Sequence, residues 1–240
     1  MSKNTIHSKF LIHWTGKDFD PGNDINNDIR KEYIKRLKNI CEQGFRMNPG
    51  TEKIWGVNNK WVEITISRIC FTEIRLSQTQ EPPKRFGKLG IGVHRDFVIE
   101  RQGNPVFYVQ SGDRGVVVEN LDILRGFIQK KSKTGDKMVE TLDIILGYLK
   151  NMSDQNQSEL KYYEEMEWRI VHLDKLMDKY ISKKDKEKNV YRLDLRPEDI
   201  RTIIFPDYET LTLALKNNSI KNFFKNHLPT ITTLNDCENF

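Results

Sequence analysis

The sequence of 240 residues predicts a single α+β domain, because its apolar segments are grouped by type. Short runs rich in β-branched and aromatic residues indicate core strands within 8–115 and again within 163–206. Two amphipathic segments between them indicate a helical insertion over 116–152, and a helical tail is expected over 207–228. Strands that flank a block of helices, rather than alternating with helices, favour an α+β architecture over repeated βαβ units.

The first two elements that the pattern predicts are a strand and a long helix. The apolar run Phe10–Thr15 is closed by Gly16 and a turn-rich segment, which is typical of a strand. Apolar residues then recur at helical spacing over Asn27–Gln43, and Gly44 stands where a C-terminal cap is expected. We therefore expect this helix to end at the glycine.

The following segments are predicted to be strands. Trp61–Ile66 alternates between apolar and polar residues, and Arg68–Thr72 either continues this strand or forms the next one. The proline pair at 82–83 ends a polar loop. Gly87–Val93 and Pro105–Val109 are two further strand candidates.

The second half of the chain is predicted to begin with two helices and to continue with short strands. The helices of the insertion are expected over 117–131 and 138–151, the second with one apolar face. A buried strand is then expected to begin at Glu167. The remaining elements in chain order are a short helix over 173–183, strands over 190–195 and 200–205, and a tail over 207–227 that is expected to be helical.

Charge, hydropathy and cysteine usage limit the classes of function. The net charge of +5 permits an acidic partner such as nucleic acid, although no nucleic-acid-binding signature with interleaved aromatic residues is present. No apolar run approaches the roughly 20 residues of a membrane helix and the start of the chain lacks a signal-peptide pattern, so we expect a cytoplasmic protein without a membrane partner. The cysteines lack CxxC spacing, which argues against a zinc site; Cys41 and Cys70 resemble core thiols, and Cys237 is expected to be exposed.

Three carboxylates, Glu164, Glu165 and Glu167, gather where the late strand begins. Carboxylates that crowd a cleft repel one another and lose hydration, so one can titrate high and act as an acid, a base or a cation stabiliser. The alternative is a solvated helix end in which a glutamate pairs with Arg169. Because strand side chains alternate, Arg169 shares a face with Glu167, where it either binds a phosphate or locks the glutamate and lowers its pKa.

Two other strand ends carry residues suited to a site. The first strand ends on a His-Trp-Thr sequence, and a middle strand ends on Phe-Thr-Glu-Ile. Each candidate also has a structural interpretation: His13 can be a hydrogen-bonded strand histidine, and Thr15 can cap the following turn. Glu73 can pair with Arg75 or Arg68, and this ion-pair role is favoured over catalysis.

The order of these motifs resembles a family of phage-defence proteins. In chain order the motifs are His-Trp-Thr, a helix closed by Gly-Phe, Phe-Thr-Glu-Ile, the segments 87–92 and 104–109, and Glu-Trp-Arg-Ile-Val at 167–171. They follow one another as in the AbiGi family of abortive phage-infection proteins. The resemblance runs through most of residues 8–205. It implies an antiviral protein of a toxin–antitoxin pair with a cognate toxin or antitoxin as its partner, and AbiGi proteins are regarded as antitoxin-like.

A more distant resemblance is to ADP-ribosyltransferase toxins of the DarT and CmdT kind, through His-x-Thr at the end of the first strand and a glutamate that opens a late strand. It implies a split β-sheet core that binds NAD, with His13 and Thr15 at the ribose and Glu167 as the catalytic glutamate. A carboxylate suits this chemistry, because breaking the nicotinamide–ribose bond leaves an oxocarbenium-like centre. The candidate rings for stacking on nicotinamide are Tyr33, Phe71 and Tyr108.

Two functions of different classes follow from these resemblances. The first is transfer of ADP-ribose from NAD to a macromolecule, with RNA or DNA as the favoured acceptor, Arg169 or Arg75 on a phosphate, and Glu164 replacing Glu167 if the strand begins earlier. The alternative is a non-catalytic antitoxin or sensor in which the same cluster is a structural network. Only the enzyme requires His13 and Glu167 to face one open cleft.

Overall fold

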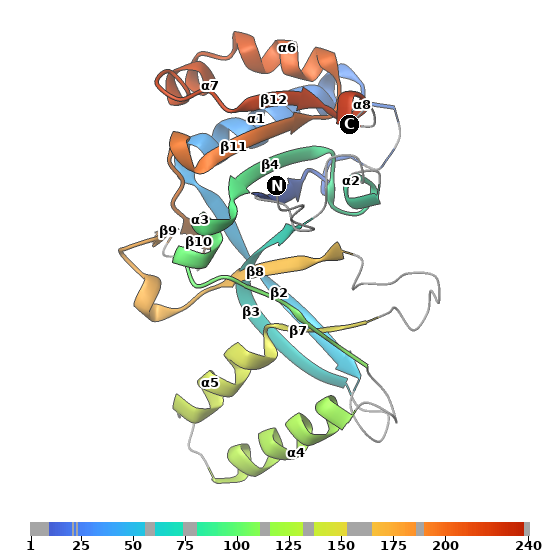
Figure 1. Ribbon diagram of the computed structural model, residues 1–240, viewed down its shortest axis with the longest axis vertical. Coiled ribbons are helices and arrows are strands. Elements are labelled where there is room, and N and C mark those ends of the chain that lie inside the picture. The colour runs from blue at the N-terminus through green and yellow to red at the C-terminus, as the bar shows by residue number, and fades with distance from the viewer. Residues whose placement is uncertain are drawn as a thin grey trace, which may run out of the picture.

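The computed structural model describes residues 10–20, 22, 24–55, 61–73, 81–110, 116–131, 137–152, 165–185 and 190–237. Within these ranges the chain forms a large, mostly antiparallel sheet with helices packed against it (Figure 1). The strand order is β12-β11-β4-β1-β3-β2-β10-β9, and β8 pairs with both β3 and β5. A separate pair, β6 and β7, is parallel.

The strands are short except for two that form a long hairpin. Those of the main sheet are β1 (Phe10–Thr15), β2 (Phe45–Trp55), β3 (Trp61–Thr72), β4 (Leu89–His94), β5 (Asn104–Pro105), β8 (Glu167–Val171), β9 (Ile181–Asp185), β10 (Val190–Leu193), β11 (Ile200–Phe205) and β12 (Thr230–Thr233). The small parallel pair consists of β6 (Phe107–Val109) and β7 (Leu149–Asn151).

The helices lie mostly toward the two ends of the molecule (Figure 1). They are α1 (Asn27–Gln43), α2 (Glu81–Phe86), α3 (Arg95–Glu100), α4 (Val116–Lys131), α5 (Lys137–Leu146), α6 (Tyr208–Lys216), α7 (Asn218–Phe223) and α8 (Leu234–Cys237). Figure 1 shows α6 and α7 at one end, α4 and α5 at the other, and the β2–β3 hairpin running between them. Separate apolar clusters support the two ends: the main core packs α1 against the sheet, and a smaller one lies under α4 and α5.

Strand β3 joins three neighbours and thereby positions the site. Its first residues pair with β2, and its last five pair with β8. At its end, Thr72 lies opposite Ile12 of β1 on one side and Glu167 of β8 on the other. The start of β2 leaves β3 and pairs with β10 instead. Within the described strands β1 and β2 are therefore both joined to β3 but not to each other, and an opening lies between them.

Several expected elements are confirmed. The first strand and the long helix have the predicted bounds, and the N–H of Gly44 caps the helix by donating to the Ile40 carbonyl. The alternative in which 61–72 is one strand is the correct one. The late strand begins at Glu167, as expected, and the insertion contains a helical pair.

Other expectations are wrong for identifiable reasons. The expected helix over 173–183 is a short 3-10 turn, because Asp178 has a positive φ of 63° and the buried Ile181 starts strand β9. The expected helical tail is confirmed but is divided into two helices, since the side chain of Asn217 caps the second one by accepting from the Ile220 N–H. Cys237 is fully buried rather than exposed, because the unforeseen β12 and α8 return the chain to the sheet.

The expected end of the second insertion helix is also wrong, and two elements near prolines were not expected. Helix α5 ends at Leu146, and the next turn leads into β7. Pro82 and Pro83 lie in the first turn of α2. Proline is tolerated there because backbone N–H groups in the first turn of a helix have no partner within the helix. Strand β2 contains Pro49 and Gly50, which weaken its signal in the sequence.

Candidate functional site

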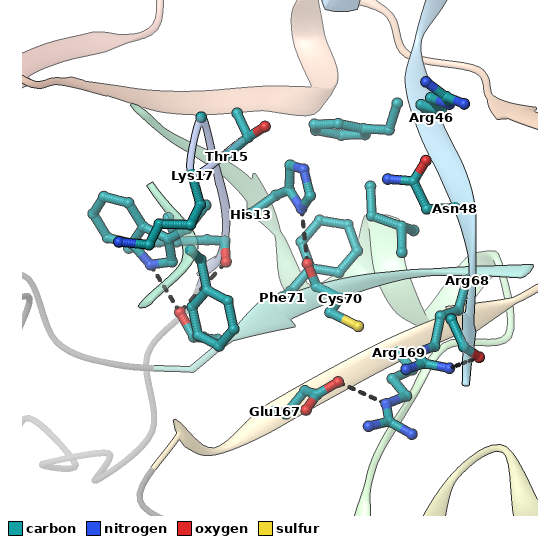
Figure 2. A pocket seen from close by; sticks show the side chains of 18 of the residues that line it. His13, Thr15, Lys17, Arg46, Asn48, Arg68, Cys70, Phe71, Glu167 and Arg169 are labelled. Atoms are coloured by element: carbon teal, nitrogen blue, oxygen red, sulfur yellow. Dashed lines mark hydrogen bonds and ion pairs between the residues drawn. The ribbon is translucent and has the colours of Figure 1, made fainter. Parts of the chain in front are cut away.

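A cavity of about 770 Å³ lies where β1 and β2 separate (Figure 2). Its walls come from β1, α1, β2 and the ends of β3 and β8, with further residues from α2, β7 and β10. The side chains that face it are mainly charged or polar, and the cations outnumber the carboxylates. The volume falls within the range of small-molecule sites in proteins, about 300–1,000 Å³.

His13 lies in the wall of the cavity and is held by a neighbouring strand. Its Nδ1 is 2.9 Å from the carbonyl oxygen of Cys70. Because a carbonyl only accepts, Nδ1 donates, which leaves Nε2 as an acceptor in the neutral ring. Burial lowers the pKa of His13 to about 4, with the Cys70 hydrogen bond opposing the shift and Arg36 adding to it. The ring also meets Phe45 and Phe71 edge-on, with centroid distances of 5.1 and 5.9 Å.

Glu167 opens β8, and both of its carboxylate oxygens are occupied by cations. Oε1 accepts from Arg169 Nε at 2.6 Å, and Oε2 accepts from Lys150 Nζ at 2.5 Å. Burial by itself would raise the pKa of Glu167, but the attraction of Arg169 and Lys150 outweighs burial and holds that pKa well below its usual range. The glutamate is therefore a buried, permanently charged group.

Arg169 locks this glutamate, which is one of the two roles that its place on the strand allowed. The expectation that it shares a face with Glu167 is confirmed. The guanidinium is 1% exposed and also donates to the Gly147 carbonyl at 2.6 Å and to Glu52 Oε1 at 2.8 Å. With its three nitrogens committed to the protein, Arg169 has no free edge for a phosphate.

The other members of the acidic cluster have different positions. Glu165 is buried and pairs with Lys150 and with Arg85. Glu164 lies outside the described residues, so its place as a substitute for Glu167 stays a prediction. Lys150 bridges the two described carboxylates, at 2.5 Å from each, and each of them has its own arginine: Arg85 for Glu165 and Arg169 for Glu167.

Two further predicted residues line the same cavity. Thr15 is buried and accepts a hydrogen bond from Arg36 Nη1 at 2.9 Å through its hydroxyl. Phe71 is also buried, with its ring against His13. The structure therefore brings five of the predicted residues to one cavity, from strands that are far apart in the sequence: His13, Thr15, Phe71, Glu167 and Arg169.

Tyr33 and Tyr108 lie elsewhere. Tyr33 is fully buried in the main core, where its hydroxyl donates to Asp20 Oδ2 at 2.7 Å. The hydroxyl of Tyr108 accepts from the backbone N–H of Glu167 at 2.8 Å, on the side of β8 that faces a smaller pocket. Neither ring contributes to the lining of the large cavity.

Glu73 belongs to the smaller pocket as well. It pairs with Arg95 and accepts from Trp168 Nε1 at 2.8 Å. The ion pair considered with Arg68 is wrong, because Arg68 donates instead to Glu52 at 2.6 Å. Arg75, the other partner considered, lies outside the described residues.

The sequence did not point to several residues that define the cavity. Lys150 reaches it from β7, a segment that resembles a helix end in the sequence. Arg46 and Arg192 reach it from β2 and β10, which pair with each other. No local motif marks any of the three, since each is placed by strand pairing.

Comparison with known families identifies the chain over most of its length. Residues 35–206 match the family described as "Putative abortive phage resistance protein AbiGi, antitoxin". The chain belongs to the AbiGi family. The match includes Glu167 and Arg169, whereas the strand that carries His13 and Thr15 precedes it. Comparisons with curated proteins and with solved structures give no match.

Two kinds of feature are absent from the described residues of this AbiGi protein. Across the described ranges, no three or more His, Cys, Asp or Glu side chains are grouped so that they would hold a metal ion. Among the described helices, none has both the length and the apolar character needed to cross a membrane. The candidate site is the cavity, where arginine, lysine and carboxylate side chains gather.

Proposed function

We propose that this protein is the non-catalytic antitoxin of an abortive-infection pair and that it acts by binding a toxin protein. The family description supports this function. The observation that carries it is the state of Glu167, whose two oxygens are held by Arg169 and Lys150. In this role the cluster is a structural network.

A locked carboxylate is poorly suited to stabilising a positive charge that develops on a substrate. Such stabilisation needs a negative charge that is free to act on the reacting centre. At Glu167, two cations already neutralise the carboxylate from within 2.6 Å. Releasing the carboxylate would also disturb Arg169, which ties it to Glu52 on the neighbouring hairpin.

The helical pair α4–α5 offers a surface of the kind that protein partners cover. Helix α4 packs Val118 and Ile128 into the small core and leaves other apolar side chains in solvent. These exposed residues are Val116, Val117, Ile123, Leu124 and Phe127 of α4 and Met138 and Ile145 of α5. A concentration of exposed apolar side chains on one pair of helices is typical of an interaction surface.

The test is deletion of the gene from its native locus, with the partner genes present. We expect growth arrest, which a plasmid copy of this chain relieves and which suppressor mutations in a toxin gene also relieve. Expression of the chain alone, without the other genes of the locus, should be harmless. A harmless deletion, or growth arrest caused by the chain alone, would contradict the antitoxin function.

The second candidate is an ADP-ribosyltransferase-like toxin that uses NAD and modifies RNA or DNA. The observation in its favour is that His13, Thr15 and Glu167 line one cavity. Its test is incubation of the protein with labelled NAD and total RNA, DNA and protein. Label transfer by the wild type that is abolished in Glu167→Gln, while this variant still melts cooperatively, would support the enzymatic function. Absence of label transfer by the wild type would contradict it.

A further inference from the structure

Two arginines face each other across the wall of the cavity. Arg46 of β2 and Arg192 of β10 are directly opposite in the antiparallel register. Such a pair lies on one face of a sheet with Cβ atoms about 4.5–5.5 Å apart. Both line the cavity, and Figure 2 shows Arg46 beside Asn48 on its β2 side.

These two arginines differ from the other arginines of the cavity in lacking an acidic partner. Arg36 pairs with Asp18 at 2.5 Å, and Arg68 pairs with Glu52 at 2.6 Å. In the described part of the chain, no carboxylate forms an ion pair with either member of the facing pair. The Nε of Arg192 is buried and has no hydrogen-bond partner among the described residues.

The facing pair is electrostatically unfavourable without a bound anion. Like charges directly opposite on neighbouring strands destabilise a sheet. Burial and the positive charges of Arg46 and Arg36 lower the pKa of Arg192. A cationic pair that lines a cavity, with a buried donor of Arg192 unused, is an arrangement that an anion would complete.

We propose that Arg46 and Arg192 bind the phosphate or pyrophosphate group of a small molecule in this cavity. Guanidinium groups match phosphate oxygens in charge and in their paired N–H geometry. The volume of about 770 Å³ accommodates a phosphorylated small molecule and its remaining groups. Such a ligand site is separate from toxin binding, and it does not require Glu167 to be catalytic.

The experiment measures thermal unfolding and calorimetric binding with three probes at constant ionic strength: inorganic pyrophosphate, ADP and a short single-stranded DNA. We expect pyrophosphate and ADP to raise the melting temperature of the wild type saturably. Arg192→Met and Arg46→Met should each weaken this binding at least about tenfold, because each removes charge-assisted hydrogen bonds. The matched control is Arg201→Met, which removes an exposed arginine from β11 and should leave binding unchanged.

The same variants separate loss of binding from damage to the fold. Without a probe, Arg46→Met and Arg192→Met should melt at or above the wild-type temperature, because each relieves the repulsion. The proposal is overturned if neither small probe stabilises the wild type, or if both variants keep the full effect. Binding of the DNA alone also overturns it, since that result would indicate a polymer-binding groove.

Discussion

Arg169 Nε donates to Glu167 Oε1 at 2.6 Å, so an ion pair joins two residues of the same strand. The two side chains share one face of β8 because residues two apart on a strand point the same way. Arg169 extends the pair to Glu52 on the β2–β3 hairpin, and Lys150 extends it to β7. The network therefore ties the hairpin and β7 to the strand that borders the cavity.

The first prediction concerns the stability of this network. Arg169→Met removes the cation that Glu167 and Glu52 share, while Lys150 and Arg68 remain beside them, and we expect it to lower the free energy of unfolding by about 3 kcal/mol. The double variant Glu167→Leu/Arg169→Met should lose less than the sum of its single variants, since it removes both charges. Urea unfolding of the four proteins measures the coupling.

An exposed ion pair provides the control. Lys53 and Glu63 face each other at 2.9 Å, with more than half of each side chain in solvent. Lys53→Met should change the free energy of unfolding by less than about 1 kcal/mol. If Lys53→Met and Arg169→Met lowered the free energy of unfolding equally, burial would not be the reason why the Arg169 network stabilises the protein.

The second prediction is a loss of stability in mild acid that originates at His13. Its pKa is about 4 in the folded protein and 6.5 in an unfolded chain. Between these values the unfolded chain takes up a proton that the folded protein does not, so the free energy of unfolding falls as pH falls through this window. The contribution of His13 is fully present above pH 6.5, and up to about 3 kcal/mol of it is lost by pH 4.

The variant that tests this dependence is His13→Asn, whose amide can replace the Nδ1 donor without titrating. Urea unfolding of the wild type and the variant from pH 7.5 to pH 4 should give a steeper decline for the wild type. A parallel decline in both proteins would assign the acid sensitivity to other groups. An NMR titration of the His13 ring gives its pKa directly.

Local sequence pattern was sufficient to predict the elements that do not depend on pairing with distant residues. Helical spacing and Gly44 determine α1, and strand alternation places Glu167 and Arg169 on one face. Long-range pairing determines the rest of the site. Arg46 and Arg192 meet only because β2 leaves β3 and pairs with β10, and nothing near either arginine in the sequence indicates that register.

The cations around Glu167 likewise include one that local sequence pattern predicts and one that it does not. Alternation predicts Arg169, but Lys150 comes from a segment in which the helical pattern continues past the end of α5. Cys237 was misplaced for a similar reason, because a polar tail hides the single turn that returns it to the sheet. In both cases burial depends on how neighbouring strands pair in the sheet, which composition does not show.

The third prediction uses two glycines with opposite surroundings. Gly44 has a φ of +76°, and a Cβ there would collide with the Leu193 carbonyl oxygen. Gly44→Ala should therefore destabilise the protein by about 1–3 kcal/mol from backbone strain alone. Gly126 lies in α4 with open space around it, and Gly126→Ala should stabilise by about 0.5–1 kcal/mol. Urea unfolding of both variants measures the contrast, and effects of the same sign would contradict it.

The last prediction locates toxin binding on the exposed face of α4. Ile123→Asp and Phe127→Asp place a charge among apolar side chains that are 65% and 56% exposed, so folding should be preserved while a partner's apolar surface is repelled. Each variant should fail to relieve the growth arrest of the deletion strain. Leu215→Asp is the matched control, because Leu215 is 51% exposed on α6 at the far end of the molecule (Figure 1). Full rescue by both α4 variants, with cooperative melting intact, would exclude this face as the toxin-binding surface.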